Sequence, residues 1–226
     1  MPEYGTPKAF RTHLRSQYTA TMLFVLLLAC DPEDPAPDTG GGAVLSLLDD
    51  HGIESPTAED DASPETPNVL SGSEDGYDWA VVRGWVKVDI ATMQATITNP
   101  DVAVNRRKVT EWTVLSVDDT DVDESYIVTE VVTDPITVDY DLTWRHLYDG
   151  GDGAIAVWEK TAGTEFVTLV RGALTTVAVG DAIDFTAVFE LATIDSDSSD
   201  TDLFVRDFYA SVLASAHGEP LPDWTE

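Results

Sequence analysis

One segment of the sequence, from Ile136 to Arg145, alternates strictly between apolar and polar side chains. Side chains of a β-strand point alternately to its two faces, so this period of two predicts a strand with one buried and one solvent-exposed face. Residues 183 to 191 repeat the pattern. Such half-buried strands require a sheet that has an apolar core on one side.

Other short segments have the composition or alternation of strands, and turn-forming Gly, Asn, Asp and Pro residues separate them. They are residues 82–90, 94–98, 109–117, 126–132, 154–159, 165–171 and 174–179. Eight or nine strands at this spacing predict a mainly β domain, an antiparallel β-sandwich, with a closed barrel as the weaker alternative. No long helical segment lies between them, which argues against a parallel α/β sheet.

The C-terminal part has a different period. Apolar residues between Val205 and Ala216 recur at helical spacing, with Asp202 as a candidate N-cap and Gly218 just past the end. This predicts one amphipathic helix over about 202–217, which packs on the sheets or closes one end. The folded domain is thus expected to span residues 78–218, followed by a tail over 219–226.

The N-terminal segment has the features of an export signal. Three basic residues, Lys8, Arg11 and Arg15, precede an apolar run from Met22 to Ala29. A basic start, a short apolar run and a small residue before the break are typical of a secretory signal peptide. The run is about half of the roughly 20 residues that a membrane-spanning helix needs. Residues 1–29 are therefore expected to be a signal peptide.

The only cysteine of the chain, Cys30, follows this run directly, in the sequence Leu27-Leu28-Ala29-Cys30. This segment resembles the lipobox of bacterial lipoproteins. The resemblance implies cleavage before Cys30, a diacylglycerol on its thiol and an acylated new N-terminus. Two or more acyl chains hold a protein stably at a membrane. The expectation is an exported protein that is anchored through Cys30 and faces the periplasm or the cell surface.

Residues 30–77 are expected to form an acidic, disordered tether. After Cys30 this span contains 13 Asp or Glu residues, six prolines and no Lys or Arg. Such a composition buries too little apolar surface to offset the loss of chain entropy, and its charge keeps the chain extended. One apolar stretch, Ala43–Leu48, is either a transient helix within the tether or a short docking motif for a partner or for the domain itself.

The charge of the chain excludes some partners. There are 42 acidic against 12 basic residues, a formal net charge of −30. Such a surface repels nucleic acid and anionic lipid headgroups. Nucleic acid is therefore not an expected partner.

Two acidic loops are candidate Ca²⁺ sites. Asp119, Asp121 and Asp123 occupy positions 1, 3 and 5 of the calcium-loop pattern, with Glu130 at position 12. Glu124 stands where that pattern needs glycine, and the flanking residues are strand-like. An EF-hand is therefore excluded, and a simpler calcium site in a hairpin loop competes with an ordinary solvated loop.

The second acidic loop precedes the predicted helix. Short loops of Asp and Ser can wrap calcium in β proteins, and they also serve as plain connectors. The carboxylates are Asp195, Asp197, Asp200 and Asp202.

Signals for catalysis are sparse. No nucleophile elbow, zinc-binding helix or phosphate-binding glycine loop occurs in the sequence. A Ser-His-Asp set is defined by geometry and not by order in the chain, and His146 near Asp149 is the least unfavourable start for one. No catalytic residue is assigned.

Trp85 is the candidate binding aromatic. It shares a strand face with Arg83 and Lys87. An aromatic ring flanked by polar groups can stack on a sugar or anchor a protein contact, and the alternative is packing at the edge of the sandwich.

These observations predict a lipid-anchored protein of the cell envelope with a non-catalytic binding or structural β module, for a protein or saccharide ligand. One alternative is an adhesion-like module that Ca²⁺ stabilises. The other is an envelope hydrolase on a β-sandwich scaffold.

Overall fold

A computed structural model describes residues 48, 51–54, 56, 65–74, 76–133, 136–149, 151–194 and 198–224. The chain divides into two compact units, Met1–Thr39 and Gly40–Glu226, and the described residues all belong to the second. The predicted signal peptide, Cys30, most of the predicted tether, and Asp195 and Asp197 lie outside the described residues. Within the described part, no helix has the length and apolar character needed to cross a membrane.

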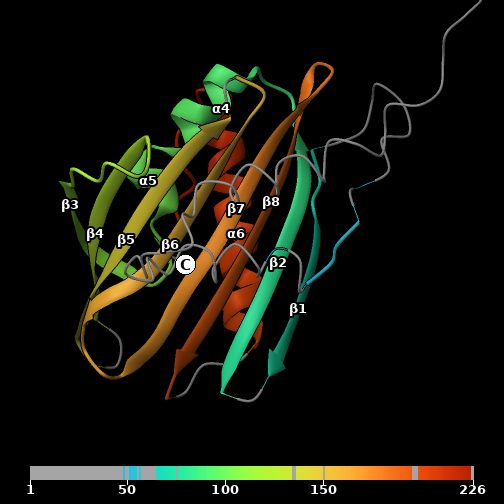
Figure 1. The fold of residues 1–226 in the computed structure, drawn as a ribbon. Coiled ribbons are helices and arrows are strands. Elements are labelled where there is room, and N and C mark those ends of the chain that lie inside the picture. The colour runs from blue at the N-terminus through green and yellow to red at the C-terminus, as the bar shows by residue number, and fades with distance from the viewer. Residues whose placement is uncertain are drawn as a thin grey trace, which may run out of the picture. The chain divides into compact units, whose positions relative to one another are not determined.

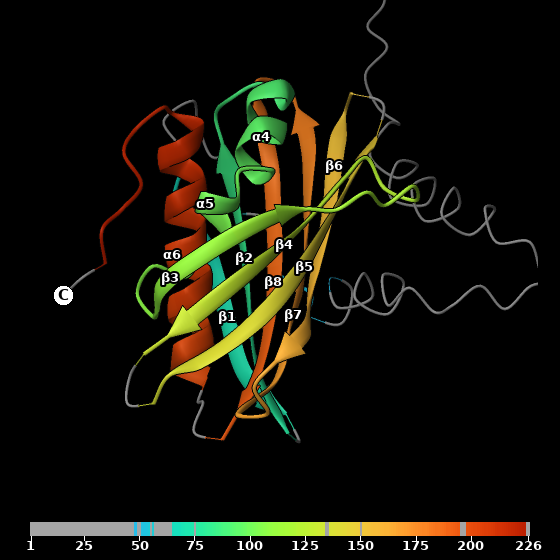
Figure 2. The same cartoon turned by 90° about the vertical axis from the view of Figure 1, so that its left-hand side faces the viewer.

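Eight strands form one open antiparallel sheet in the order β1-β2-β8-β7-β6-β5-β4-β3. Three helices accompany it within the ranges that the structure describes: α4 (Ile90–Ile97), α5 (Pro100–Ala103) and the long α6 (Ser198–Ala216). Figure 2 shows α6 lying lengthwise along one face of the sheet, with the β3–β5 part curving round beside it. The strands are β1 (Asn68–Glu74), β2 (Tyr77–Val86), β3 (Val109–Ser116), β4 (Glu124–Val132), β5 (Val138–Asp149), β6 (Gly153–Gly163), β7 (Val167–Val179) and β8 (Ala182–Thr193) (Figure 1).

The predicted class, mainly antiparallel β with one C-terminal helix, is confirmed. The strands belong to a single sheet, whereas the sequence suggested two packed sheets. The pairing of β2 with β8 joins the first and last parts of the domain into that sheet. Helix α6 supplies the second layer, because its apolar face covers the inner side of the sheet. Alternation shows that a strand has a buried face, but not whether a sheet or a helix covers it.

The predicted strand over residues 94–98 is wrong, since these residues belong to α4 or directly follow it. The Asp89 side chain caps this helix by accepting a hydrogen bond from the Thr92 amide at 2.7 Å. Met93 and Ile97, four residues apart, are buried on one side of the helix. Strand β2 ends at Val86, before the predicted end of that strand at residue 90. The two strands predicted over 165–171 and 174–179 form one continuous strand, β7.

Helix α6 begins at Ser198, four residues before the predicted start. Asp202 is therefore not the N-cap; it lies within the helix and pairs with Arg206 at 2.6 Å. The helix ends at Ala216, ahead of Gly218 as predicted. It packs closely on β2, because a Cβ on Gly84 would lie only 2.4 Å from the Tyr209 hydroxyl oxygen. The bare glycine lets that hydroxyl donate a 2.8 Å hydrogen bond to the Trp85 carbonyl.

The folded part of the chain starts earlier than predicted. Strand β1, within the expected tether, pairs along its length with β2. Further upstream, the described residues of the tether lie on the outer face of the sheet. Leu48 and Ile53 pack against a buried apolar cluster there, and the His51 ring stacks on Trp79 with 4.0 Å between centroids. These described residues therefore pack on the domain. Residues 43–47 of the Ala43–Leu48 stretch lie outside the described residues, so the choice between a transient helix and a docking motif stays a prediction.

Candidate ligand-binding cavity

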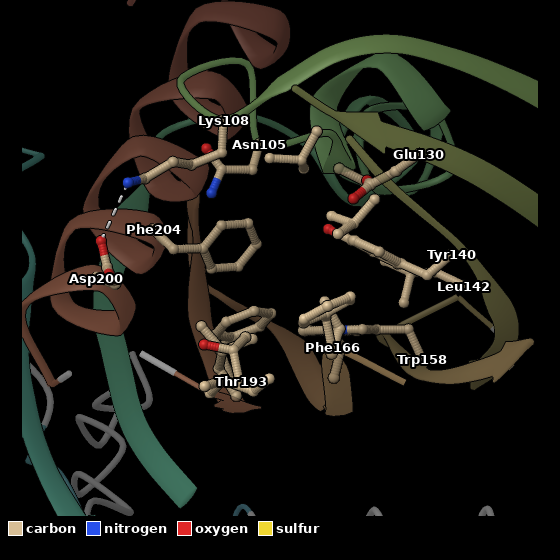
Figure 3. Close-up of a pocket in the computed structure, with 18 of the residues that line it drawn as sticks. Asn105, Lys108, Glu130, Tyr140, Leu142, Trp158, Phe166, Thr193, Asp200 and Phe204 are labelled. Carbon is tan, nitrogen blue, oxygen red and sulfur yellow. Dashed lines mark ion pairs between the residues drawn. The ribbon is translucent and has the colours of Figure 1, made fainter. Parts of the chain in front are cut away.

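A cavity of about 520 Å³ lies between the inner face of the sheet and α6 (Figure 3). Strands β4 to β8, helix α6 and the segment between α5 and β3 contribute side chains to its lining. The lining is largely apolar, and includes Val138, Leu142, Trp144, Trp158, Val170 and Phe204.

Strand alternation and register place these residues on the inner face. On β4, Tyr126, Val128 and Glu130 share that face, and they pair across to Trp144, Leu142 and Tyr140 of β5. The register shifts once between Asp141 and Leu142 against β6, and once between Val167 and Leu169 against β8. Such bulges bend a strand and increase its twist. Both irregularities lie beside the cavity, where the sheet curves round it.

Glu130 is a buried acid in this apolar lining. Its side chain and that of Tyr140 lie together on one side of the cavity (Figure 3). Burial raises the pKa of Glu130 from 4.5 to about 7, and a hydrogen bond from the Tyr140 hydroxyl partly opposes this rise. Burial and the neighbouring Glu130 also raise the pKa of Tyr140 well above its ordinary value. At neutral pH the carboxyl therefore carries its proton part of the time and can then donate a hydrogen bond.

The lining also includes an ion pair and three exposed apolar side chains. Lys108 and Asp200 form an ion pair at 3.4 Å, drawn across the cavity from Glu130 in Figure 3. Three large apolar side chains that line the cavity are also strongly exposed: Ile136 by 46%, Phe166 by 48% and Ile194 by 68%. They mark an apolar rim through which the cavity reaches solvent.

A wall of stacked aromatic rings extends from the cavity into the core. The Trp144 and Trp158 rings lie 4.4 Å apart between centroids, and His146 and Tyr126 continue the stack. Burial lowers the pKa of His146 to about 4, so its imidazole is neutral at physiological pH. Neither ring nitrogen has a hydrogen-bond partner among the described residues, so Asp149 does not orient it. The geometry of a catalytic His146–Asp149 pair is not present.

The candidate calcium loop between β3 and β4 does not bring its carboxylates together. Asp119 pairs with Arg145 at 3.3 Å, and Asp123 accepts a hydrogen bond from the Tyr148 amide at 2.7 Å. Asp121 is exposed. Among the described residues, no group of three or more His, Cys, Asp or Glu side chains is placed to hold a metal ion.

The second candidate calcium loop is described in part. Asp195 and Asp197 lie outside the described residues, so a site that includes them stays a prediction. Asp200 faces Lys108 at the rim of the cavity, and Asp202 pairs with Arg206 on α6.

The side chain of Trp85 is engaged by the chain's own N-terminal segment through its indole N–H. Its indole N–H donates a 2.9 Å hydrogen bond to the Pro56 carbonyl of the chain's own N-terminal segment. The neighbouring Arg83 donates to the Ile53 carbonyl at 3.0 Å and pairs with Asp184. The outer face around Trp85 is thus occupied by residues of the expected tether.

The sequence analysis considered Glu130 only as position 12 of a calcium-loop pattern, and it did not identify Tyr140 as a site residue. One signal was available, because Glu130 falls in phase with Tyr126 and Val128 on the apolar face of the predicted strand. An acid at such an inward position is unusual and indicates a special environment.

Comparison with known proteins gives a likeness of fold. No family model and no curated protein matches this chain. Among solved structures, human StAR-related lipid transfer protein 5 matches with a TM-score of 0.50 and 9% identity, over 79% of this chain and 95% of that one. The ZhuI aromatase/cyclase from Streptomyces sp. R1128 matches with a TM-score of 0.43 and 8% identity, over 63% and 92%. A fragment of a StAR-related lipid transfer protein from Xanthomonas axonopodis matches with 0.42 and 12%, over 67% and 97%. This chain thus shares with the human protein the arrangement of one curved antiparallel sheet and a long C-terminal helix.

Proposed function

We propose that the domain is a non-catalytic binding module that takes up an apolar, lipid-like small molecule in the cavity between the sheet and α6. The observation that carries this proposal is the apolar cavity itself. Its volume of about 520 Å³ falls within the roughly 300–1,000 Å³ typical of sites for small ligands. The lining is apolar with a few polar groups, which is the usual composition of such sites.

The fold adds support of a weaker kind. The human structure with the same arrangement is named as a lipid transfer protein. A shared fold does not establish a shared function, since one fold hosts many activities. The proposal therefore depends on the lining of this chain's own cavity.

The polar groups of the cavity favour binding over catalysis by paired acids. Two carboxylates line it, Glu130 and Asp200. Asp200 is engaged by Lys108 at the rim, whereas Glu130 is buried beside Tyr140 on the other side. Acid–base hydrolysis needs two carboxyl groups that flank one bond. Here Glu130 is the one carboxyl group of the described lining without an ion-pair partner, so the two acids do not act on one bond as a pair.

Filling the cavity should weaken ligand binding. We expect the purified protein to enhance the fluorescence of the neutral apolar dye N-phenyl-1-naphthylamine, and Val170→Phe to weaken that binding at least about tenfold, because the larger ring occupies cavity volume. Val170 is 3% exposed on the inner face of β7.

Val177→Phe is the matched control, since Val177 is 40% exposed on the same strand and does not line the cavity. It should bind the dye as the wild type does. Equal binding by wild type and Val170→Phe, or no binding by the wild type, would exclude the cavity as the site.

We propose further that the module is displayed at the cell envelope through lipid on Cys30, which the lipobox-like segment supports. In mass spectrometry of the membrane fraction, the mature wild type should exceed the mass of the chain from Cys30 onward by a diacylglycerol and an acyl group. Cys30→Ser should carry neither and should keep its signal segment. A wild-type chain released with an unmodified thiol would refute the anchor.

A further inference from the structure

Five buried polar atoms near the cavity have no hydrogen-bond partner within the described parts of the chain. They are the Tyr126 hydroxyl, the indole nitrogens of Trp144 and Trp158, and both ring nitrogens of His146. The large majority of buried side-chain polar atoms in proteins are hydrogen-bonded, and an unpaired one costs free energy. Five such atoms in one place call for an explanation in terms of a missing partner.

These atoms belong to one continuous group of rings. The centroid distances are 4.4 Å for Trp144–Trp158, 6.1 Å for Trp144–His146 and 5.4 Å for Tyr126–His146. All four residues are at most 3% exposed. Trp144 and Trp158 line the cavity, so the group begins at its wall and continues inward over strands β4, β5 and β6.

The two members of the group that line the cavity, Trp144 and Trp158, carry hydrogen-bond donors only. An indole N–H can only donate, and a neutral imidazole has one donor and one acceptor nitrogen. The complement to two indole donors at a cavity wall is therefore an acceptor oxygen. A carboxylate or phosphate would lack a partner charge, because the cation that lines the cavity, Lys108, is already paired with Asp200. Burial of an unpaired charge is far more costly than burial of a neutral oxygen.

We propose that the ligand is an apolar molecule with an uncharged acceptor group, such as a ketone or ester carbonyl, that accepts hydrogen bonds from the indole N–H groups of Trp144 and Trp158. This rests on the proposed function and adds the ligand class to it. The nitrogens are covered by neighbouring atoms, so binding involves a shift of the two indole rings. That shift should change the intrinsic tryptophan fluorescence.

Three probes of nearly equal shape separate the two proposals. They are 2-acetylnaphthalene, which has a carbonyl, 2-isopropylnaphthalene, which has a methyl group in place of the oxygen, and the anion 2-naphthoate. Their affinities are measured by displacement of N-phenyl-1-naphthylamine from the full chain. We expect the ketone to bind about five- to tenfold more tightly than the hydrocarbon, as one net hydrogen bond allows, and the anion to bind most weakly.

Variants then locate the donors. Trp144→Phe and Trp158→Phe remove the N–H groups and should reduce the ratio of ketone affinity to hydrocarbon affinity to less than twofold. Trp85→Phe, on the outer face, is the matched control and should keep the preference. Infrared spectra of the bound, isotope-labelled ketone in the wild type give a second readout that needs no variant. Its carbonyl band should lie at lower frequency than in hexane.

The outcomes are distinguishable. If none of the probes binds, the proposed function fails. If ketone and hydrocarbon bind equally and the carbonyl band stays at its position in hexane, the cavity binds apolar molecules but the inferred ligand class is wrong. Tightest binding of the anion would also overturn the inference.

Discussion

Glu130→Gln should raise the free energy of unfolding by roughly 3 kcal/mol at pH 8 and leave it nearly unchanged at pH 4. Burial raises the pKa of this carboxyl from 4.5 to about 7 in the folded protein, and each pH unit between the two values corresponds to about 1.4 kcal/mol. Below pH 4.5 the group carries a proton in both states. As the pH rises from 4.5 to 7, the unfolded chain loses that proton first, so folding becomes less favourable. Above pH 7 the loss is complete.

The difference between wild type and variant isolates this effect. Glutamine has the shape of a protonated glutamic acid and does not ionise, so the variant avoids the cost of burying a charge. We expect urea unfolding of both proteins from pH 4 to pH 9 to show a difference in the free energy of unfolding that grows between pH 4.5 and 7. Glu111→Gln, on the exposed part of β3, removes one acid without changing the cavity and should show almost no gap. If the free energies of unfolding of Glu130→Gln and the wild type differ by the same amount at every pH, Glu130 does not titrate near pH 7.

His146 opposes Glu130 over part of this range. Burial lowers the pKa of His146 from 6.5 to about 4. Below pH 6.5 His146 is protonated in the unfolded chain but stays neutral in the folded protein. The free energy of unfolding therefore decreases as the pH falls from 6.5 towards 4. Between pH 4.5 and 6.5 the two groups therefore tilt the stability curve of the wild type in opposite directions. The Glu130→Gln variant should show the His146 slope alone, with stability rising with pH in this window.

Local patterns in the sequence predict the strands but not what they pack against. The alternation in β5 and β8 identified which side chains point inward, and Phe185, Phe189 and Trp144 are indeed buried. The same alternation is compatible with a covering sheet or a covering helix, because both bury one face of a strand. Whether a second sheet or a helix covers the strands depends on the pairing of β2 with β8. These strands are about a hundred residues apart, so no local pattern predicts their pairing.

Part of helix α4 was wrongly predicted as a strand. Its residues Thr96, Ile97 and the following Thr98 are β-branched, and β-branched residues favour strands. The helix forms because the Asp89 cap and the burial of Met93 and Ile97 outweigh this modest preference. The cavity was not predicted. Glu130 falls in phase with the inward residues of its strand, but the volume around it depends on where α6 lies.

The outer face of the sheet could not be inferred from the strands alone. Glu190 lies on the face of β8 that looked solvent-exposed, yet its side chain is fully buried. Side chains that are far from Glu190 in the sequence contact its carboxylate. Arg171 pairs with one carboxylate oxygen at 2.6 Å, and His51 from the N-terminal segment lies 3.8 Å from the other. That second oxygen has no hydrogen-bond partner among the described residues. The docked N-terminal segment thus helps to enclose a charge that depends mainly on Arg171.

Arg171→Met should therefore cost about 3 kcal/mol of unfolding free energy at pH 7. Removal of one partner from a buried ion pair typically costs about 3–5 kcal/mol, because the remaining charge stays desolvated without compensation. The lower end applies here, since the Arg171 side chain is 32% exposed and water can reach part of the vacated site. Arg206→Met is the control. It breaks a pair with Asp202 in which Arg206 is 51% exposed, and exposed pairs contribute only about 0–1 kcal/mol. Addition of Glu190→Leu to Arg171→Met should restore most of the lost stability, because it removes the unpaired charge itself. If the double variant is as unstable as Arg171→Met alone, the loss comes from packing of the arginine stem and not from the buried carboxylate of Glu190.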